Sequence, residues 1–169
     1  MSVHQNYLKE LQIRGFQSDP AQLRAIDALE RRANEWAAYK EKRSNKLKKL
    51  VNRPPIPRGV YMFGGVGRGK SFLMDCFFDA VPIQRKTRLH FHEFMREVHR
   101  ELRELQGKAN PLDILGQQIA KRYKLICFDE FHVADITDAM ILHRLLDALF
   151  DNGVGFVTTS NFKPDDLYP

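Results

Sequence analysis

The segment Gly64–Ser71 limits the folds open to this chain more than any other part of the sequence. It reads Gly-Gly-Val-Gly-Arg-Gly-Lys-Ser and fits the pattern G-x-x-x-x-G-K-[ST]. A short apolar segment of β type, Gly59–Phe63, precedes it, and an apolar run typical of a helix, Phe72–Phe78, follows it before Pro82. A strand, a glycine-rich loop and a helix in this order predict a phosphate-binding loop in an α/β fold.

The residue types of this loop suit phosphate chemistry. Because glycine has no side chain, consecutive main-chain N–H groups can close around phosphate oxygens. The start of the following helix adds unpaired N–H groups and the positive end of its dipole. We expect Lys70 to contact the outer phosphates and the Ser71 hydroxyl to bind Mg²⁺.

The predicted nucleotide site spans the whole loop and the first turn of the helix. Its residues are Gly64, Gly65, Val66, Gly67, Arg68, Gly69, Lys70, Ser71 and Phe72. Arg68 can contact a phosphate or extend into solvent, and both interpretations stay open. The alternative to the entire site is a glycine-rich turn before an ordinary helix, which the matching flanks make the weaker interpretation.

A second element ends in two acidic residues. Leu125–Phe128 is an apolar run that suits a central strand of a parallel sheet, and Asp129 and Glu130 follow it directly. We expect Asp129 to hold the magnesium ion through its water shell. Glu130 is then placed to orient and polarise the water that attacks the γ-phosphate. A strand ending in two acids is common by itself, and it indicates a nucleotide site only together with the loop.

A third element ends in small polar residues. Val154–Asn161 reads as another buried strand, and Asn161 is expected to hydrogen-bond the attacking water or the γ-phosphate. A plain asparagine turn after a strand is the alternative. Ligands of open α/β sheets bind at the carboxyl ends of the strands, where all three elements place their polar residues. The sequence therefore predicts one site, with Lys70, Glu130 and Asn161 as its catalytic residues.

Strands and helices alternate along the rest of the chain. Strands are expected near Gly59, Arg88, Lys124 and Val154, the second of them covering Arg88–His92. Helical periodicity follows Pro20, Phe94, Asn110 and Ile136. This alternation predicts an α/β fold of the P-loop type, a parallel sheet with flanking helices. His90 and His92 would share a face of their strand, but no third ligand has an obvious position, so a structural role is favoured over a metal site.

Three blocks of sequence carry a family resemblance. The order of phosphate loop, Asp-Glu pair and strand-terminal Asn resembles the AAA+ class of ATPases. More narrowly, Phe63–Asp75, His90–Met95 and Phe128–Ile136 resemble the ZapE-type cell-division ATPases, the ATPase-family-gene-one-like family. The resemblance covers about Leu11–Pro169. It implies ATP and Mg²⁺ as cofactors and hydrolysis of ATP to remodel a protein partner.

The resemblance also implies partners and missing parts. In bacteria it implies association with the tubulin-like division-ring protein FtsZ, and in mitochondrial relatives a role in protein quality control. It implies a homo-oligomeric ring whose site is completed by an arginine from the neighbouring subunit and by a helical lid, both expected beyond Pro169 together with a fifth strand. We therefore expect residues 1–53 to form an N-terminal helical segment and residues 54–169 the N-terminal part of an AAA+ nucleotide-binding domain. Such a fragment should bind nucleotide but hydrolyse ATP poorly.

Composition agrees with this interpretation without deciding it. The 169 residues are 43% hydrophobic and 28% charged, which is ordinary for a globular domain, and no apolar run is long enough to span a bilayer. Cys76 and Cys127 lie in apolar segments without metal or disulfide spacing, as expected of core thiols in a reducing compartment. The bacterial cytoplasm is the expected location, with the division site and peripheral membrane contact left open.

A basic run keeps other functions open. Lys40–Arg58 contains eight basic residues and the single acid Glu41. Such a run can bind nucleic acid, anionic lipid or an acidic partner, although a solvated helix face and linker is the favoured interpretation. A DNA-associated loader or initiator ATPase and a non-hydrolysing scaffold are the alternative functions. A small-molecule phosphotransferase is disfavoured, because such an enzyme has no need of a water-activating acid after Asp129.

Overall fold

The computed structural model describes residues 2–14, 20–43, 45, 47, 55–57, 60–63, 68–133 and 135–160. Its elements, in chain order, are α1 (Val3–Arg14), α2 (Pro20–Lys42), β1 (Val60–Phe63), α4 (Arg68–Ala80), β2 (Lys86–His90), α5 (Phe91–Glu104), α6 (Pro111–Arg122), β3 (Leu125–Asp129), α7 (Ile136–Asp151) and β4 (Gly155–Ser160). The predicted α/β fold is confirmed: the strands form a four-stranded parallel sheet in the order β1-β4-β3-β2.

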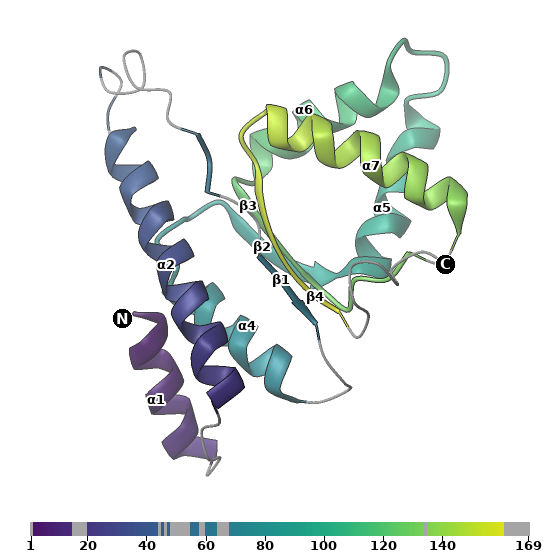
Figure 1. Cartoon of the computed structure of the whole chain (residues 1–169). Coiled ribbons are helices and arrows are strands. Elements are labelled where there is room, and N and C mark those ends of the chain that lie inside the picture. Colours follow the sequence, from purple (N-terminus) through teal and green to yellow (C-terminus); the bar gives the residue numbers. More distant parts are fainter. Residues whose placement is uncertain are drawn as a thin grey trace.

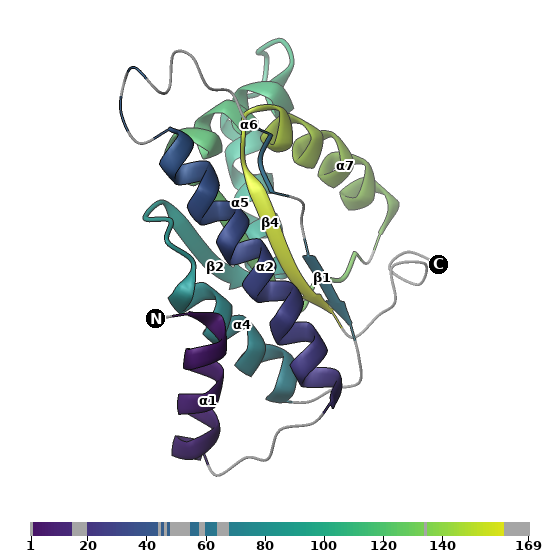
Figure 2. The ribbon, with the colours of Figure 1, turned by 60° about the vertical axis from the view of Figure 1, so that its left-hand side comes forward.

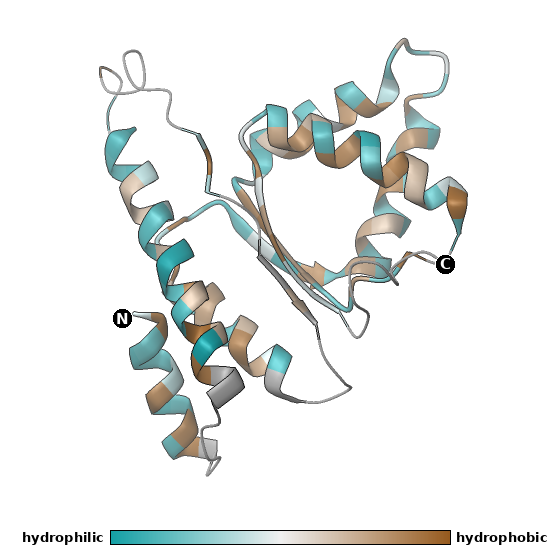
Figure 3. Ribbon diagram, viewed as in Figure 1, coloured by the Kyte–Doolittle hydropathy of each residue, from teal (hydrophilic) through white to brown (hydrophobic). Residues whose placement is uncertain are grey.

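Helices cover both faces of this sheet. In Figure 1, α1, α2 and α4 lie on one side of the strands, and α5, α6 and α7 lie on the other. The view in Figure 2 shows α2 running alongside β4, with α1 and α4 next to it. Two hydrophobic clusters fill the two interfaces, one built around α1, α2 and α4 and the other around α5, α6 and α7. Figure 3 shows apolar residues along the strands and on parts of the helices turned toward them.

Burial explains the composition of the strands. All five residues of β3 are buried, because the strand lies between β2 and β4 and is covered on both faces. This confirms the prediction of a central strand. Cys127 lies in it, and Cys76 lies in α4; both thiols are buried and outside any disulfide, as expected from their apolar surroundings. No helix within the described ranges is long and apolar enough to cross a membrane.

The expected strand Arg88–His92 is wrong at its end. The strand β2 stops at His90, and Phe91 and His92 already belong to α5. Phe91 is buried against Phe94, Phe128 and Phe131, so the aromatic core draws the chain into a helix at this point. The prediction that His90 and His92 share a strand face fails with it, although their rings still stack with centroids 5.6 Å apart.

Local signals set the ends of α7. The carboxylate of Asp135 accepts a hydrogen bond from the main-chain N–H of Asp138 at 2.8 Å, which caps the first turn. The helix is followed by Gly153, whose φ of +83° lies in the left-handed region that glycine adopts readily. This turn leads directly into β4, which returns the chain to the sheet beside β3.

Candidate functional site

The helix α4 carries the second half of the phosphate-loop motif. It begins at Arg68, so Lys70 and Ser71 lie in its first turn, where main-chain N–H groups lack helical partners. Gly64, Gly65, Val66 and Gly67 lie outside the described residues, as does the side chain of Arg68. Partial burial lowers the pKa of Lys70, and the Ser71 side chain is exposed. A helix start with these two residues suits an anionic ligand.

Phe72 has a different position from the other predicted site residues. Its side chain is only 1% exposed and stacks on the ring of Tyr7 in α1. The ring is therefore part of the core. Any contribution of Phe72 to nucleotide binding must come from its main-chain N–H.

Asp129 and Glu130 lie at the carboxyl end of β3 in contrasting environments. Asp129 is the last residue of the strand, and only 8% of its surface is exposed. The Glu130 side chain is 70% exposed, and its backbone has a φ of +56°. That conformation is unfavourable for a residue with a Cβ, and it turns the chain away from the strand direction. The main-chain N–H of Glu130 donates to Thr159 Oγ1 on β4 at 3.3 Å.

Arg88 brings the two halves of the site together. It lies on β2, and its Nη2 is 3.3 Å from the main-chain oxygen of Ser71 and 3.3 Å from Asp129 Oδ1. Its Nε donates to Asp129 Oδ2 at 2.8 Å. The same Nη2 atom contacts both Ser71 and Asp129. The main chain in the first turn of α4 and the carboxylate at the end of β3 are therefore separated by a single bridging nitrogen. The Ser71 hydroxyl and the Asp129 carboxylate are oxygen ligands of the kind that Mg²⁺ prefers, and they belong to two residues that this guanidinium joins.

His90 lies beside Glu130. The parallel register places His90 opposite Asp129, and His90 Nδ1 lies 3.6 Å from Glu130 Oε2. This distance is too long for a hydrogen bond but within reach of an ion pair. Within the described part of the chain, His90 Nδ1 is buried without a hydrogen-bond partner. Sequence analysis assigned neither Arg88 nor His90 to the site, because only the pairing of β2 with β3 shows that they reach the acidic residues.

The end of β4 is joined to the segment after Glu130. The N–H of Phe131 donates to the main-chain oxygen of Thr159 at 2.7 Å, and Ser160 Oγ donates to the main-chain oxygen of Phe131 at 2.6 Å. These bonds fix the carboxyl ends of β3 and β4 side by side. Asn161, the predicted third member of the site, lies outside the described residues.

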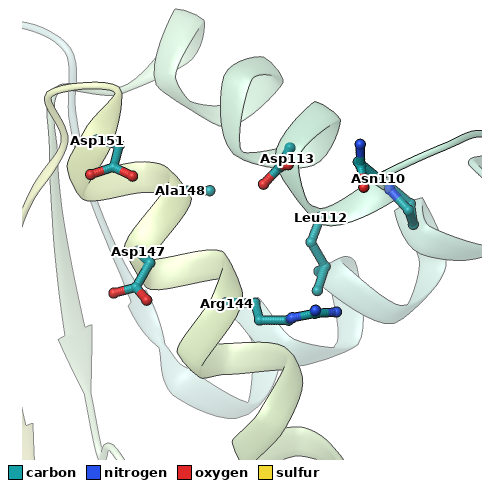
Figure 4. Close-up of a pocket in the computed structure, with 8 residues that line it drawn as sticks. Asn110, Leu112, Asp113, Arg144, Asp147, Ala148 and Asp151 are labelled. Carbon is teal, nitrogen blue, oxygen red and sulfur yellow. The ribbon is translucent and has the colours of Figure 1, made fainter.

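Polar residues also gather elsewhere in the described part of the fold. Among the residues that the structure describes, no group of three or more His, Cys, Asp or Glu side chains could hold a metal ion. A pocket between α6 and α7 has Asp113, Asp147 and Asp151 around it, with Arg144 at one side (Figure 4). Its lining includes no residue of α4 or of the strand ends. It is distinct from the site at Ser71 and Asp129.

Comparison with known proteins gives a consistent result. The family described as AFG1-like ATPase matches residues 1–169. The cell division protein ZapE of Escherichia coli (strain K12) is 55% identical over 111 residues, which cover 66% of this chain and 30% of ZapE. Lactation elevated protein 1 homolog B of Danio rerio is 44% identical over 128 residues, which cover 69% of this chain and 25% of that protein. The chain thus spans less than a third of the length of these curated relatives.

Solved structures show the same fold at low sequence identity. DnaI superimposes with a TM-score of 0.53 and 18% identity, covering 89% of this chain and 71% of the DnaI chain. Domain III of the replication initiation protein DnaA from Thermotoga maritima gives a TM-score of 0.51 and 22% identity, covering 64% and 46%. The predicted P-loop fold of the AAA+ type is confirmed by this likeness. On the match of its whole length, this chain belongs to the AFG1-like ATPase family.

Proposed function

We propose that this chain binds ATP with Mg²⁺ and hydrolyses it, as part of an ATPase that remodels a protein partner. The observation that carries the proposal is the meeting of Ser71 and Asp129 at one guanidinium, although they are 58 positions apart in the chain. Membership of an ATPase family supports the nucleotide, and the oxygen ligands support the metal. The bound metal would neutralise charge on the phosphates and fix their geometry.

Each described residue has a distinct task in this proposal. Lys70 and the first N–H groups of α4 bind the phosphates, and the Ser71 hydroxyl binds the metal. Asp129 accepts hydrogen bonds from metal-bound water. The exposed Glu130 carboxylate, directed out of the sheet edge by its backbone, orients and polarises the attacking water. Asn161 follows β4 directly in the sequence, and we propose that it contacts the γ-phosphate or that water.

A role in bacterial cell division is the biological context that we propose. It rests on the 55% identity to ZapE, whose name describes a cell division protein. Assembly into a ring, a division-ring protein as partner, and a location in the bacterial cytoplasm at the division site belong to the same proposal. These are properties of a whole protein, and they are to be tested with the full-length protein.

A paired substitution tests the activity. Lys70→Ala removes the phosphate-binding charge and should abolish binding of a fluorescent ATP analogue. Glu130→Gln keeps the shape of the site but removes the carboxylate base, so this variant should bind ATP normally. Turnover of the full-length protein should fall on the order of 10²-fold. Lys121→Ala, in the last turn of α6, is the matched control for loss of a lysine. Unchanged turnover in Glu130→Gln would assign the water-activating role to another residue.

DNA-associated loading or initiation is the second candidate function. The basic run favours it, since α2 ends with the exposed residues Lys40 and Lys42 and further bases follow in the sequence. The remodelling function predicts weak binding to DNA, whereas the loader predicts tight binding that weakens steeply with salt. Neutralising Lys46, Lys48 and Lys49 together should abolish the DNA binding if the loader function is correct. Binding that is independent of these lysines would exclude it.

A further inference from the structure

Arg88 lies in the middle of the proposed site but belongs to neither sequence motif. It is the third residue of β2, opposite Cys127 in the register, and its side chain extends along the sheet to reach Asp129. The side chain is 21% exposed. Arg88 contacts two elements at once: the end of β3 and the helix α4 that follows the phosphate loop.

Its contacts involve the whole guanidinium group. Nε and Nη2 donate to the two carboxylate oxygens of Asp129, at 2.8 and 3.3 Å. Nη2 also donates to the main-chain oxygen of Ser71 at 3.3 Å, and Nη1 forms an ion pair with Asp75 on the same helix. Ser71 and Asp75 are one helical turn apart, so they lie on the same side of α4. A planar group with donors in a fixed fork can make all of these contacts together, which a single ammonium cannot.

We propose that Arg88 is a positioning residue that holds the Asp129 carboxylate in register with Ser71, so that both can serve the same metal ion. This inference rests on the proposed function of the site. A carboxylate oxygen has about two acceptor directions. Arg88 uses one on each oxygen of Asp129 and leaves capacity for metal-bound water. The same guanidinium ties the carboxylate to the main chain of the residue whose hydroxyl binds the metal.

The electrostatics support a permanent ion pair. Burial opposes the charged form of Arg88, but the hydrogen bonds and charges of Asp129 and Asp75 outweigh that effect, so the pKa of Arg88 lies above its ordinary value. Asp129 is buried, and without the guanidinium it would be an uncompensated charge. Its carboxylate would then move in the absence of nucleotide. Metal binding would then include the cost of ordering the Asp129 carboxylate, which Arg88 otherwise fixes in advance.

The positioning role of Arg88 predicts different effects on the binding of nucleotide with a metal and without one. Lys70 and the N–H groups of α4 bind phosphates without a metal, whereas Asp129 acts only through the metal. Removal of Arg88 should therefore weaken binding with Mg²⁺ and change binding in EDTA little. An arginine that merely stabilised the fold, or attracted phosphates in general, would change both dissociation constants by the same factor. An arginine that competed with the metal for Asp129 would, on removal, strengthen binding with Mg²⁺.

The experiment measures the dissociation constant of a fluorescent, non-hydrolysable ATP analogue on the full-length protein, in Mg²⁺ and in EDTA. The ratio of the two constants gives the gain in affinity from the metal. We expect Arg88→Met to reduce this gain about tenfold, the effect of losing close to 1.4 kcal/mol of metal-specific binding. Arg88→Lys should reduce it less, because the charge remains but the fork is lost. The constant in EDTA should stay within about twofold in both variants.

Two further variants make the result decisive. Arg85→Met loses an arginine whose Nη1 donates to the main-chain oxygen of Lys121 at 3.0 Å, outside the site, and should leave the gain unchanged. Asp75→Ala keeps the pair of Arg88 with Asp129 but frees Nη1, so it should reduce the gain by less than Arg88→Met does. Circular dichroism checks that each variant folds. If Arg88→Met does not fold, the gains in affinity measured for Arg88→Lys and Asp75→Ala are compared instead.

The outcomes distinguish this inference from the proposed function. If the unmodified protein binds the analogue equally in Mg²⁺ and in EDTA, the metal site and the proposed function fail together. If the unmodified protein shows the gain and the Arg88 variants keep it or increase it, the positioning role is wrong while the function stands. Equal weakening in both conditions also overturns the positioning role.

Discussion

The ring of Tyr7 in α1 stacks on the ring of Phe72 in α4, with centroids 5.5 Å apart and an angle of 25° between the planes. Phe72 follows Ser71 directly, so the N-terminal helix α1 packs against the start of α4, which carries the proposed phosphate-binding residues. Asn6 adds a hydrogen bond from its Nδ2 to the main-chain oxygen of Cys76 at 3.3 Å. The segment before the loop is therefore part of the support of the proposed site.

This contact predicts a large effect of a substitution far from the motif in sequence. Tyr7 is fully buried, and Tyr7→Ala should lower the free energy of unfolding by about 3 kcal/mol, because it leaves a cavity against Phe72. Leu8→Ala is the matched control: Leu8 is the next residue in the same helix, is 57% exposed, and should change stability by no more than about 0.5 kcal/mol. Urea denaturation measures both. Equal effects of the two substitutions would contradict the packing of α1 on α4.

Close packing at Gly155 leaves no room for a larger side chain at the start of β4. A Cβ at this position would overlap Cζ2 of Trp36 and lie 3.0 Å from Cη2, and Trp36 is 1% exposed. Gly155→Ala should therefore cost about 2 kcal/mol of stability through overpacking. The smaller ring of Trp36→Phe makes room, so the double variant should lose less than the sum of the two single losses. A thermodynamic cycle from urea denaturation measures this coupling, and simple additivity would show that α2 does not press on β4 here.

The backbone of Glu130 predicts that two variants at this position differ in stability while both lose activity. Since its φ of +56° is unfavourable for a residue with a Cβ, Glu130→Gly should be more stable than Glu130→Ala by about 1 kcal/mol. Both variants lack the carboxylate, so both should lose ATP turnover in the full-length protein. Thermal denaturation and a phosphate-release assay measure the two properties. A glycine variant less stable than the alanine variant would show that the turn carries no strain.

We expect the buried thiol of Cys127 to make the stability of the fold depend on pH. Burial in β3 raises the pKa of its thiol to about 12, from an ordinary value of 9.0. The folded chain then holds the thiol proton more tightly than the unfolded chain. The contribution of this thiol to the free energy of unfolding is therefore complete below pH 9 and is lost as the pH rises from 9 toward 12. The stability difference between the unmodified protein and Cys127→Ala should shrink by up to about 1.4 kcal/mol per pH unit in this window.

Urea denaturation at several pH values, with a reductant present, measures the Cys127 effect. Other groups titrate in the same range but contribute equally to both proteins, and the cost of the smaller alanine side chain does not depend on pH. A stability difference that stays constant from pH 8 upward would mean that the thiol is not desolvated as its position in β3 indicates.

Short-range patterns were enough to predict the elements that carry the proposed nucleotide site. The apolar run Leu125–Phe128 is buried in a central strand as expected, and Asp129 ends that strand. Lys70 and Ser71 stand at the start of the expected helix. These predictions succeeded because burial on both faces selects continuous apolar residues and because a helix start after a glycine loop has a local signature. The assignment of Phe91 and His92 to a strand was wrong, because their place in α5 depends on the aromatic core.

Sequence alone predicted which residues bear the chemistry and in which elements most of them lie, since both follow from patterns within a dozen neighbouring positions. The tertiary structure decided which of those elements touch. The order β1-β4-β3-β2 sets β2 beside β3, and only this pairing brings Arg88 to Asp129, across 41 positions of sequence, and His90 to Glu130. Parallel strands are joined through long crossovers, so their neighbours are fixed by how the helices pack on the sheet and not by any local pattern.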